Sequence, residues 1–259
     1  MKIPYYEVHS FAERIGGGNP AGVCVLDAWL QETDMQKIAA ENNLSETAFV
    51  VKDADGFRLR WFAPKAEVDL CGHATLAAAY VLYSERGITD SSIKFFTRSG
   101  ILNVARRGTE FTLEFPVLDI QPCEAPADLV AGLGRTPLAV YRSMDYVAVF
   151  GSEEEIAALT PDLDYLKKLD LRAVVVTAPG KDVDYVCRCF GPKIGIPEDP
   201  VTGSAQCELV PYWAQQKNQK RFSVIQRSSR GGRLTCELKG EQVFISGSTV
   251  LYLKGELFL

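Results

Sequence analysis

Residues 68–82, VDLCGHATLAAAYVL, place the strongest limit on how this chain can fold. Beyond Gly72 and His73 the segment is almost entirely apolar, so a helix formed by it would be apolar around most of its circumference. A surface helix has one apolar and one polar face, and this pattern lacks the polar face. We therefore predict a helix from residue 74 to about residue 86 that is buried on nearly all sides.

A second segment, SAQCELVPYWAQQ from Ser204, has a similar character. It carries Pro211 about two turns in, which predicts a kink or a break in the helix. The two segments also begin alike, with DLCGHA at residues 69–74 and DPVTGSA at residues 199–205. Each half of the chain is therefore expected to contain one buried helix with a glycine at its entry.

Short strand-like segments separated by Gly and Asp turns make up most of both halves. Pro116, Pro122 and Pro126 interrupt any regular element between the halves. We predict an α+β fold with an N-terminal lobe at residues 1–117 and a C-terminal lobe at residues 118–249. Each lobe is expected to be a mixed, mostly antiparallel sheet wrapped around its central helix.

Two shorter surface helices are indicated by N-terminal capping patterns. Thr33 with Gln36, and Ser152 with Glu155, each place a hydroxyl three residues before a side chain that can reach back to the backbone. We expect each hydroxyl residue to cap the helix that follows it.

Composition narrows the class of partner. Apolar residues make up 47% and charged residues 24% of the chain, the formal net charge is −5, and no block of Lys or Arg occurs. This pattern does not favour nucleic acid or an anionic membrane as partner. No apolar run approaches the roughly 18 to 20 residues that span a bilayer, and the start MKIPYYEVHSFAE lacks the apolar region of a signal peptide. We expect a cytoplasmic protein with a small-molecule partner and no membrane contact.

The seven cysteines are scattered along the chain. The one close pair, Cys187 and Cys189, alternates along a predicted strand without a second pair or a histidine cluster. We expect reduced, mostly buried thiols and no metal.

The two helix entries carry the first indication of function. A helix N-terminus leaves backbone N–H groups unpaired and adds partial positive charge, so it attracts anions, and a glycine there lets a ligand approach closely. Small residues at a tight helix packing site are the alternative for either entry alone. For the pair we favour a cleft between the lobes that holds a carboxylate or an oxyanion.

A proton-transfer group is the second requirement, and Glu46 in NNLSETAFVV is the best candidate. At the edge of an apolar strand its carboxyl group would be desolvated, which raises the pKa toward the range of a general acid or base. An exposed charge at a helix end is the alternative. His73 and Asp199, one from each helix entry, complete a candidate trio, although Asp199 could equally serve only as a helix-terminal charge.

Six segments together resemble the PhzF-like family, named for phenazine biosynthesis, in the order that the family shows. They are GGGNPAGV (16–23), NLSETAFV (43–50), DLCGHATLAAA (69–79), EDPVTGSAQC (198–207), SSRGGRL (228–234) and SGSTV (246–250). The resemblance implies the diaminopimelate epimerase-like fold, two pseudo-symmetric lobes with the active site between them. It also implies a homodimer, and a C-terminal strand at about residues 250–259 that crosses back to the first lobe.

In the phenazine enzyme of that family the reaction is a cofactor-free isomerisation of trans-2,3-dihydro-3-hydroxyanthranilate. The resemblance places the acid–base role on Glu46, with His73 and Asp199 lining the substrate. Further residues that it places in the substrate site are Asn19, Ser45, Cys71, Gly72, Gly203 and Ser204.

The resulting interpretation is an isomerase that moves a proton on a small carboxylated, perhaps cyclic, substrate without a cofactor. One alternative is a racemase or epimerase that uses Cys71, whose pKa the helix N-terminus would depress. Such enzymes of this fold use two opposed thiols, and Cys207 lies three residues past Ser204 rather than at the second entry. The other alternative is a protein that binds a small ligand without chemistry, because fold alone does not fix function.

Overall fold

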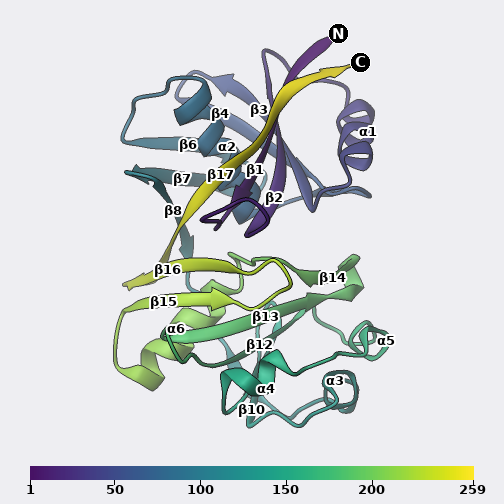
Figure 1. Cartoon of the computed structure of the whole chain (residues 1–259), viewed down its shortest axis with the longest axis vertical. Helices are drawn as coiled ribbons and strands as arrows, with labels where there is room; N and C mark the ends of the chain where they lie inside the picture. The colour runs from purple at the N-terminus through teal and green to yellow at the C-terminus, as the bar shows by residue number, and fades with distance from the viewer. The chain divides into compact units, whose positions relative to one another are not determined.

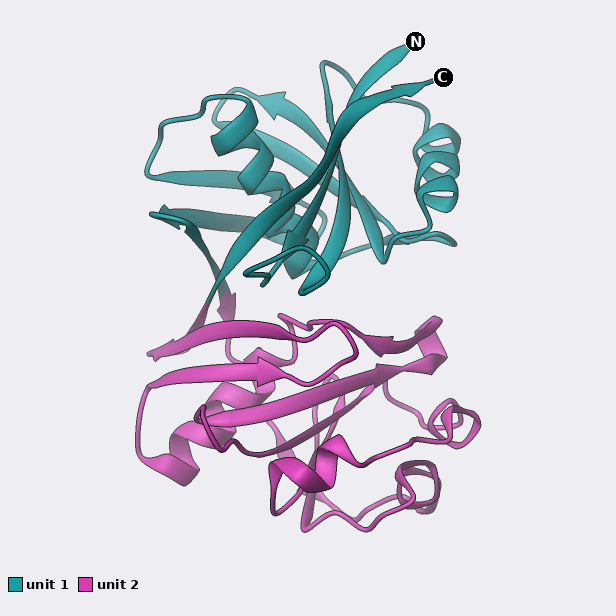
Figure 2. Ribbon diagram, viewed as in Figure 1, with its two compact units in different colours: residues 1–114, 246–259 teal, residues 115–245 magenta.

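The computed structural model describes residues 1–259, and strands dominate it (Figure 1). The chain forms two compact units, coloured separately in Figure 2. Unit 1 comprises residues 1–114 and 246–259, and unit 2 comprises residues 115–245. Both contain parallel as well as antiparallel strand pairs together with few helices, so the predicted α+β class is confirmed.

Unit 1 is a mixed sheet around one buried helix. Its antiparallel neighbours β2–β1–β17 continue through the parallel pair β2–β3, and β4 pairs in parallel with β6. The elements are β1 (Lys2–Ser10), β2 (Asn19–Leu26), α1 (Glu32–Asn42), β3 (Glu46–Asp53), β4 (Gly56–Phe62), β5 (Glu67–Val68), α2 (Gly72–Glu85), β6 (Ser92–Thr97), β7 (Gly100–Arg107), β8 (Glu110–Pro116) and β17 (Gln242–Phe258).

Helix α2 is the buried helix that residues 68–82 predict. It packs against β1, β2, β3 and β7 (Figure 1), and all of its residues are buried except Gly72, Tyr80, Ser84 and Glu85. The alanines in the middle of the helix leave room for strands to approach it closely, and burial of its apolar surface stabilises the unit. The prediction of a helix buried on nearly all sides is confirmed.

Unit 2 combines a second mixed sheet with α6. Here β11–β12 and β13–β15 are parallel pairs, and the other printed pairs are antiparallel. The elements are β9 (Gln121–Cys123), α3 (Ala127–Leu133), β10 (Ala139–Arg142), β11 (Tyr146–Val149), α4 (Glu153–Ala157), α5 (Leu163–Leu166), β12 (Val174–Pro179), β13 (Tyr185–Gly191), the 3₁₀ turn η1 (Pro192–Ile194), β14 (Ile196–Asp199), α6 (Gln206–Lys217), β15 (Arg221–Gln226) and β16 (Gly232–Lys239).

Helix α6 begins at Gln206, two residues after Ser204, and continues through Pro211 to Lys217. The expected break does not occur. Proline lacks the N–H that would bond the carbonyl four residues earlier, and the Leu118 N–H donates to that carbonyl, of Cys207, at 3.0 Å. A strand-side donor therefore satisfies the group that the proline leaves open.

One of the two capping predictions is confirmed and the other is wrong. The Ser152 hydroxyl accepts a hydrogen bond from the Glu155 N–H at 3.3 Å and caps α4. Helix α1 instead begins at Glu32, before Thr33, and has no side-chain cap. The Gln36 amide, which the capping pattern assigned to the backbone of the first turn, donates to the Ala63 carbonyl at 2.8 Å.

The long strand β17 carries the chain from unit 2 back to unit 1. Its last part pairs antiparallel with β1, from Lys2 opposite Phe258 to Ser10 opposite Thr249. The other crossing occurs in β8, close to Glu114. None of the helices is long and apolar enough to pass through a membrane.

Truncation of Leu76, which is 0% exposed in α2, should destabilise the protein by about 2–5 kcal/mol because it leaves a cavity against the surrounding strands. Leu76→Ala should therefore lower the urea midpoint followed by circular dichroism. Leu138→Ala, at a side chain that is 76% exposed, is the matched control and should change stability by less than about 0.5 kcal/mol. Equal midpoints for the two variants would contradict the role of α2 as the core of unit 1.

Candidate active site

Two strand starts lie side by side in unit 1 and bring three predicted site residues together. Strands β2 and β3 run parallel with Ala21 opposite Glu46, so Asn19 and Ser45 lie at the same end of the sheet. The Ser45 hydroxyl donates to the Asn19 side-chain oxygen at 3.3 Å. Gly18, before Asn19, has a φ of +67°, and a Cβ there would overlap the Ser10 carbonyl. The tight approach of Gly18 thus fixes where β2 begins.

The first turn of α2 is held by two buried hydroxyl groups. Ser10 at the end of β1 donates to the His73 carbonyl at 2.7 Å, and Thr75 donates to the Cys71 carbonyl at 2.6 Å. Cys71 occupies the N-cap position but makes no side-chain cap, so its thiol points elsewhere. The backbone of residues 71–73 is therefore set by neighbouring elements.

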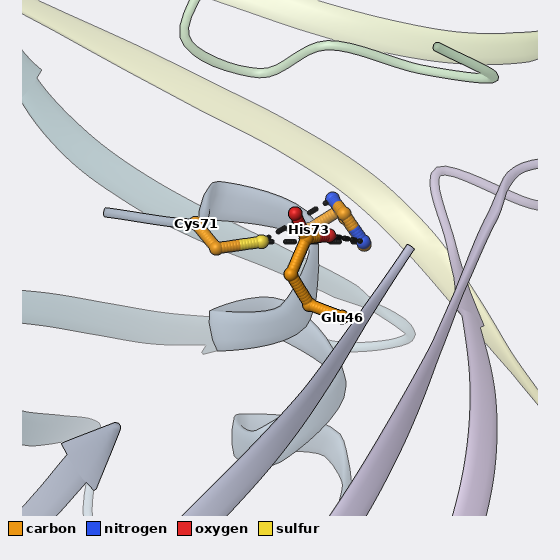
Figure 3. Close-up of side chains that lie close together, drawn as sticks. All are labelled: Glu46, Cys71 and His73. Atoms are coloured by element: carbon orange, nitrogen blue, oxygen red, sulfur yellow. Dashed lines mark hydrogen bonds and ion pairs between the residues drawn. The ribbon is translucent and has the colours of Figure 1, made fainter. Parts of the chain in front are cut away.

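Glu46, Cys71 and His73 form one buried cluster (Figure 3). The His73 Nε2 lies 3.1 Å from Glu46 Oε2, and its Nδ1 lies 3.5 Å from the Cys71 sulfur. The three residues are only 6–7% exposed. The structure thus excludes the alternative in which Glu46 is an exposed charge at a helix end.

The charge state of this cluster differs from the sequence-based expectation. Burial raises the pKa of Glu46, but the neighbouring His73 outweighs burial and lowers it below the ordinary value. For His73, burial lowers the pKa, and contacts with Cys71 and Glu46 raise it well above the ordinary value. A raised pKa for Glu46 was the wrong prediction, because the sequence does not show that an imidazole 27 residues away neutralises the buried charge.

The Cys71 thiol is also the reverse of what its position at a helix N-terminus suggests. Burial, with a further contribution from Glu46, raises its pKa to about 11. The depressed pKa is therefore not found, and the thiol is neutral at pH 7. Since a neutral thiol carries no charge, we attribute the protonation of His73 to the Glu46 carboxylate.

The Oε2 atom of Glu46 is buried without a hydrogen-bond partner, because its contact with His73 is an ion pair that is not aligned as a hydrogen bond. An acceptor position thus stays open on this carboxylate. The donor atoms of the cluster all lie within 4.8 Å of one another, and thiolate, imidazole and carboxylate are ligands of Zn²⁺. A metal would first have to displace the protons on Cys71 and His73, whereas proton transfer can use the cluster as it stands.

The remaining predicted residues lie together in unit 2, on the segment that enters α6. Asp199 ends β14, and its carboxylate accepts a hydrogen bond from the Thr202 hydroxyl at 2.5 Å. The fully buried Gln226 donates to the Asp199 carbonyl at 2.7 Å and accepts from the Thr202 N–H at 2.9 Å. Gly203 and Ser204 follow directly in the turn before the helix.

Three buried or half-buried charged residues beside Ser204 escaped the sequence-based prediction. The Arg172 guanidinium grips the fully buried Asp145 through Nε at 2.9 Å and Nη2 at 2.5 Å, and Nη2 also donates to the Ser204 hydroxyl at 3.2 Å. Glu208 in α6 accepts the Asp145 N–H at 3.0 Å. An acidic residue within the apolar CELV stretch of the helix was the one sequence sign of this cluster.

Glu208 has a strongly perturbed pKa. Burial and the nearby Asp145 charge raise it to about 8, so the carboxyl group carries a proton near neutral pH. Its Oε2 is buried and has no hydrogen-bond partner.

Structural comparison shows which class of protein this architecture defines. A crystal structure of a phenazine biosynthesis PhzF-family protein from Enterococcus faecalis is similar over 100% of both chains, with a TM-score of 0.98 and 46% identity. A predicted epimerase from Pseudomonas aeruginosa, 22% identical, has a TM-score of 0.77 over 99% of both chains and shares the fold. The architecture is thus the epimerase-like α+β fold.

Sequence comparison identifies the family. The sequence model described as phenazine biosynthesis-like protein, PhzC-PhzF, matches residues 8–255. A Pseudomonas aeruginosa protein named as an uncharacterized isomerase is 48% identical over 259 residues, which is 100% of both chains. The chain belongs to the phenazine biosynthesis-like family, and this family supports an isomerase or epimerase type of activity.

The ionic partner of His73 can be tested without a substrate. In the unsubstituted protein the His73 imidazole should stay protonated well above pH 6.5. Glu46→Gln removes the carboxylate, so burial should dominate and the pKa of His73 should fall below 6.5. NMR titration can follow this change, because the chain has only two histidines and a His9→Gln variant assigns them. An unchanged His73 titration in Glu46→Gln would contradict the assigned ion pair.

Glu208 should make the protein less stable as pH rises. Its pKa is raised in the folded state from 4.5 to about 8, so between these values the unfolded chain loses a proton that the folded chain keeps. Stability conferred by this group is therefore lost progressively from about pH 4.5 to about pH 8. Glu208→Gln should remove this part of the pH dependence of the unfolding midpoint, whereas the exposed Glu124→Gln should retain it. Parallel curves for the parent and Glu208→Gln would disprove the shift.

Proposed function

We propose that this chain is a cofactor-independent isomerase that moves a proton on a small carboxylated substrate, with Glu46 as the group that takes and returns the proton. Membership in the phenazine biosynthesis-like family supports the isomerase class. The observation that carries the role of Glu46 is its buried contact with His73 at 3.1 Å. A buried carboxylate that is ionised, yet has an open acceptor atom, is suited to remove a proton.

The charges of the cluster suit a reversible transfer. His73 keeps Glu46 ionised, so the carboxylate can accept a proton from a substrate C–H bond while that bond's electron pair stays on the substrate. The transfer leaves a neutral carboxyl group in a site of low exposure, where burial favours the neutral form. The same O–H then returns its proton to a different substrate atom. The imidazolium of His73 is available to stabilise negative charge on the substrate between the two steps.

Binding of the substrate carboxylate is assigned to the small polar groups at the starts of the two buried helices. Gly72 belongs to the start of α2, and Gly203 and Ser204 precede α6. We infer further contacts with substrate from Asn19, Ser45, Cys71 and Asp199. A homodimer, a cytoplasmic location and the lack of nucleic-acid and membrane partners stay predictions from the sequence.

A Cys71-dependent racemase is the second candidate, because the Cys71 sulfur lies 3.5 Å from His73 Nδ1. Two observations weigh against it. The pKa of Cys71 is about 11, and Cys207, the thiol nearest in sequence to the second helix entry, is 4% exposed with a pKa raised to about 12 by burial. A thiolate is the reactive form in such enzymes, so neither cysteine has the character of a base at neutral pH.

Solvent exchange distinguishes these functions. A panel of cyclic and amino-acid carboxylates incubated in D₂O should include one whose C–H proton exchanges in the presence of the protein, as seen by ¹H NMR. Glu46→Gln should slow that exchange by about 10²–10⁴-fold, because it removes the proton acceptor without changing the size of the side chain. Cys71→Ala should stay within about tenfold of the parent, and dialysis against a chelator should leave the rate unchanged.

The opposite pattern of variants favours the racemase: exchange lost in Cys71→Ala and kept in Glu46→Gln would replace the proposed base with the thiol. Tight carboxylate binding with no exchange across the panel would favour a protein that binds a ligand without chemistry.

A further inference from the structure

The guanidinium of Arg172 has donors that the protein itself does not use. Its Nε and Nη2 atoms hold Asp145, and Nη2 also donates to Ser204, but Nη1 makes no hydrogen bond within the chain. The Arg172 side chain is 32% exposed, whereas Asp145 is 0% exposed. Asp145 therefore fixes the guanidinium from the buried side and leaves its Nη1 edge available.

The Ser204 hydroxyl offers a second donor at the same place. Its oxygen accepts the hydrogen bond from Arg172 Nη2 at 3.2 Å and makes no hydrogen bond as a donor. Because a hydroxyl group can donate and accept at once, its proton is available to an outside acceptor. Two donors on neighbouring side chains, one of them cationic, match the paired oxygens of a carboxylate.

The charges of the surrounding cluster also allow an anion to bind. Asp145 balances the charge of Arg172, and the raised pKa of Glu208 keeps that buried carboxyl neutral near pH 7. Ionised Glu208 would have made the cluster net negative. As found, an incoming carboxylate does not meet an uncompensated negative charge.

We propose that Arg172 binds the substrate carboxylate directly, through Nη1, beside the hydroxyl of Ser204. This inference rests on the proposed function, since it supplies the cationic group that the carboxylated substrate of that function requires. It adds a residue from before β12 to a site otherwise predicted from the helix entries and β3. The alternative is that Arg172 only fastens Asp145 and Ser204 to each other.

Binding of a simple carboxylate tests the proposal separately from catalysis. The full chain carrying Glu46→Gln, which removes the proposed base, is titrated with benzoate and with benzamide, its uncharged counterpart. Benzoate should bind more tightly than benzamide. Adding Arg172→Lys keeps a positive charge beside Asp145 but replaces the planar fork with a single ammonium. It should weaken benzoate by about 10- to 100-fold and change benzamide little.

Arg142→Lys is the matched control, because Arg142 is also in unit 2 and pairs with an aspartate, Asp170, at 2.9 Å. It should leave benzoate binding unchanged. Ser204→Ala should weaken benzoate by a smaller factor than Arg172→Lys, since it removes a neutral donor.

A measurement without substitution at Arg172 protects the test if that variant misfolds. Benzoate added to ¹⁵N-labelled protein should shift the side-chain resonances of Arg172 and leave those of Arg142 in place. The proposal is overturned if benzoate does not bind, if it leaves the Arg172 resonances unmoved, or if Arg172→Lys weakens benzoate and benzamide equally. Persistence of Arg172-dependent benzoate binding alongside unimpaired exchange in Glu46→Gln would refute the proposed base alone.

Discussion

Burial of α2 on nearly all sides is the constraint on which unit 1 depends. A helix that exposes almost no surface must be surrounded by strands, and its alanine-rich middle lets β1, β2, β3 and β7 pack against it. Such a helix has little freedom to shift along its axis. Its first residues, Cys71, Gly72 and His73, are consequently held at one end of the sheet, where β2 and β3 also begin.

The Glu46–His73 contact follows from that placement and explains the electrostatics of the site. A buried charge without a partner is costly, and breaking a buried ion pair typically costs about 3–5 kcal/mol. The pair keeps both groups charged at low exposure, at the expense of the usual tendency of buried carboxyl groups to become neutral. The open acceptor atom on Glu46 then gives the buried charge a chemical use.

The sequence predicted the features that depend on local pattern and missed those that depend on distant partners. The apolar circumference of α2, the cap at Ser152 and the family motifs are visible within short segments. The direction of the Glu46 pKa shift and the continuity of α6 through Pro211 are not, because each depends on a group far away in the chain, His73 in one case and Leu118 in the other. Arg172 and Asp145 are 27 residues apart and lie in no motif, so only the folded chain shows their contact.

The two helix entries begin with similar sequences but differ in chemistry. The entry to α2 has a carboxylate, an imidazolium and a neutral thiol, whereas the entry to α6 has a serine hydroxyl held by an arginine. Inverting a stereocentre by two opposed bases calls for a proton-transfer group at each entry. The hydroxyl and guanidinium at α6 are donors to anions and have no basic character at neutral pH. The asymmetry therefore favours a division of labour, in which the α2 entry moves the proton and the α6 entry binds negative charge, over a symmetrical two-thiol mechanism.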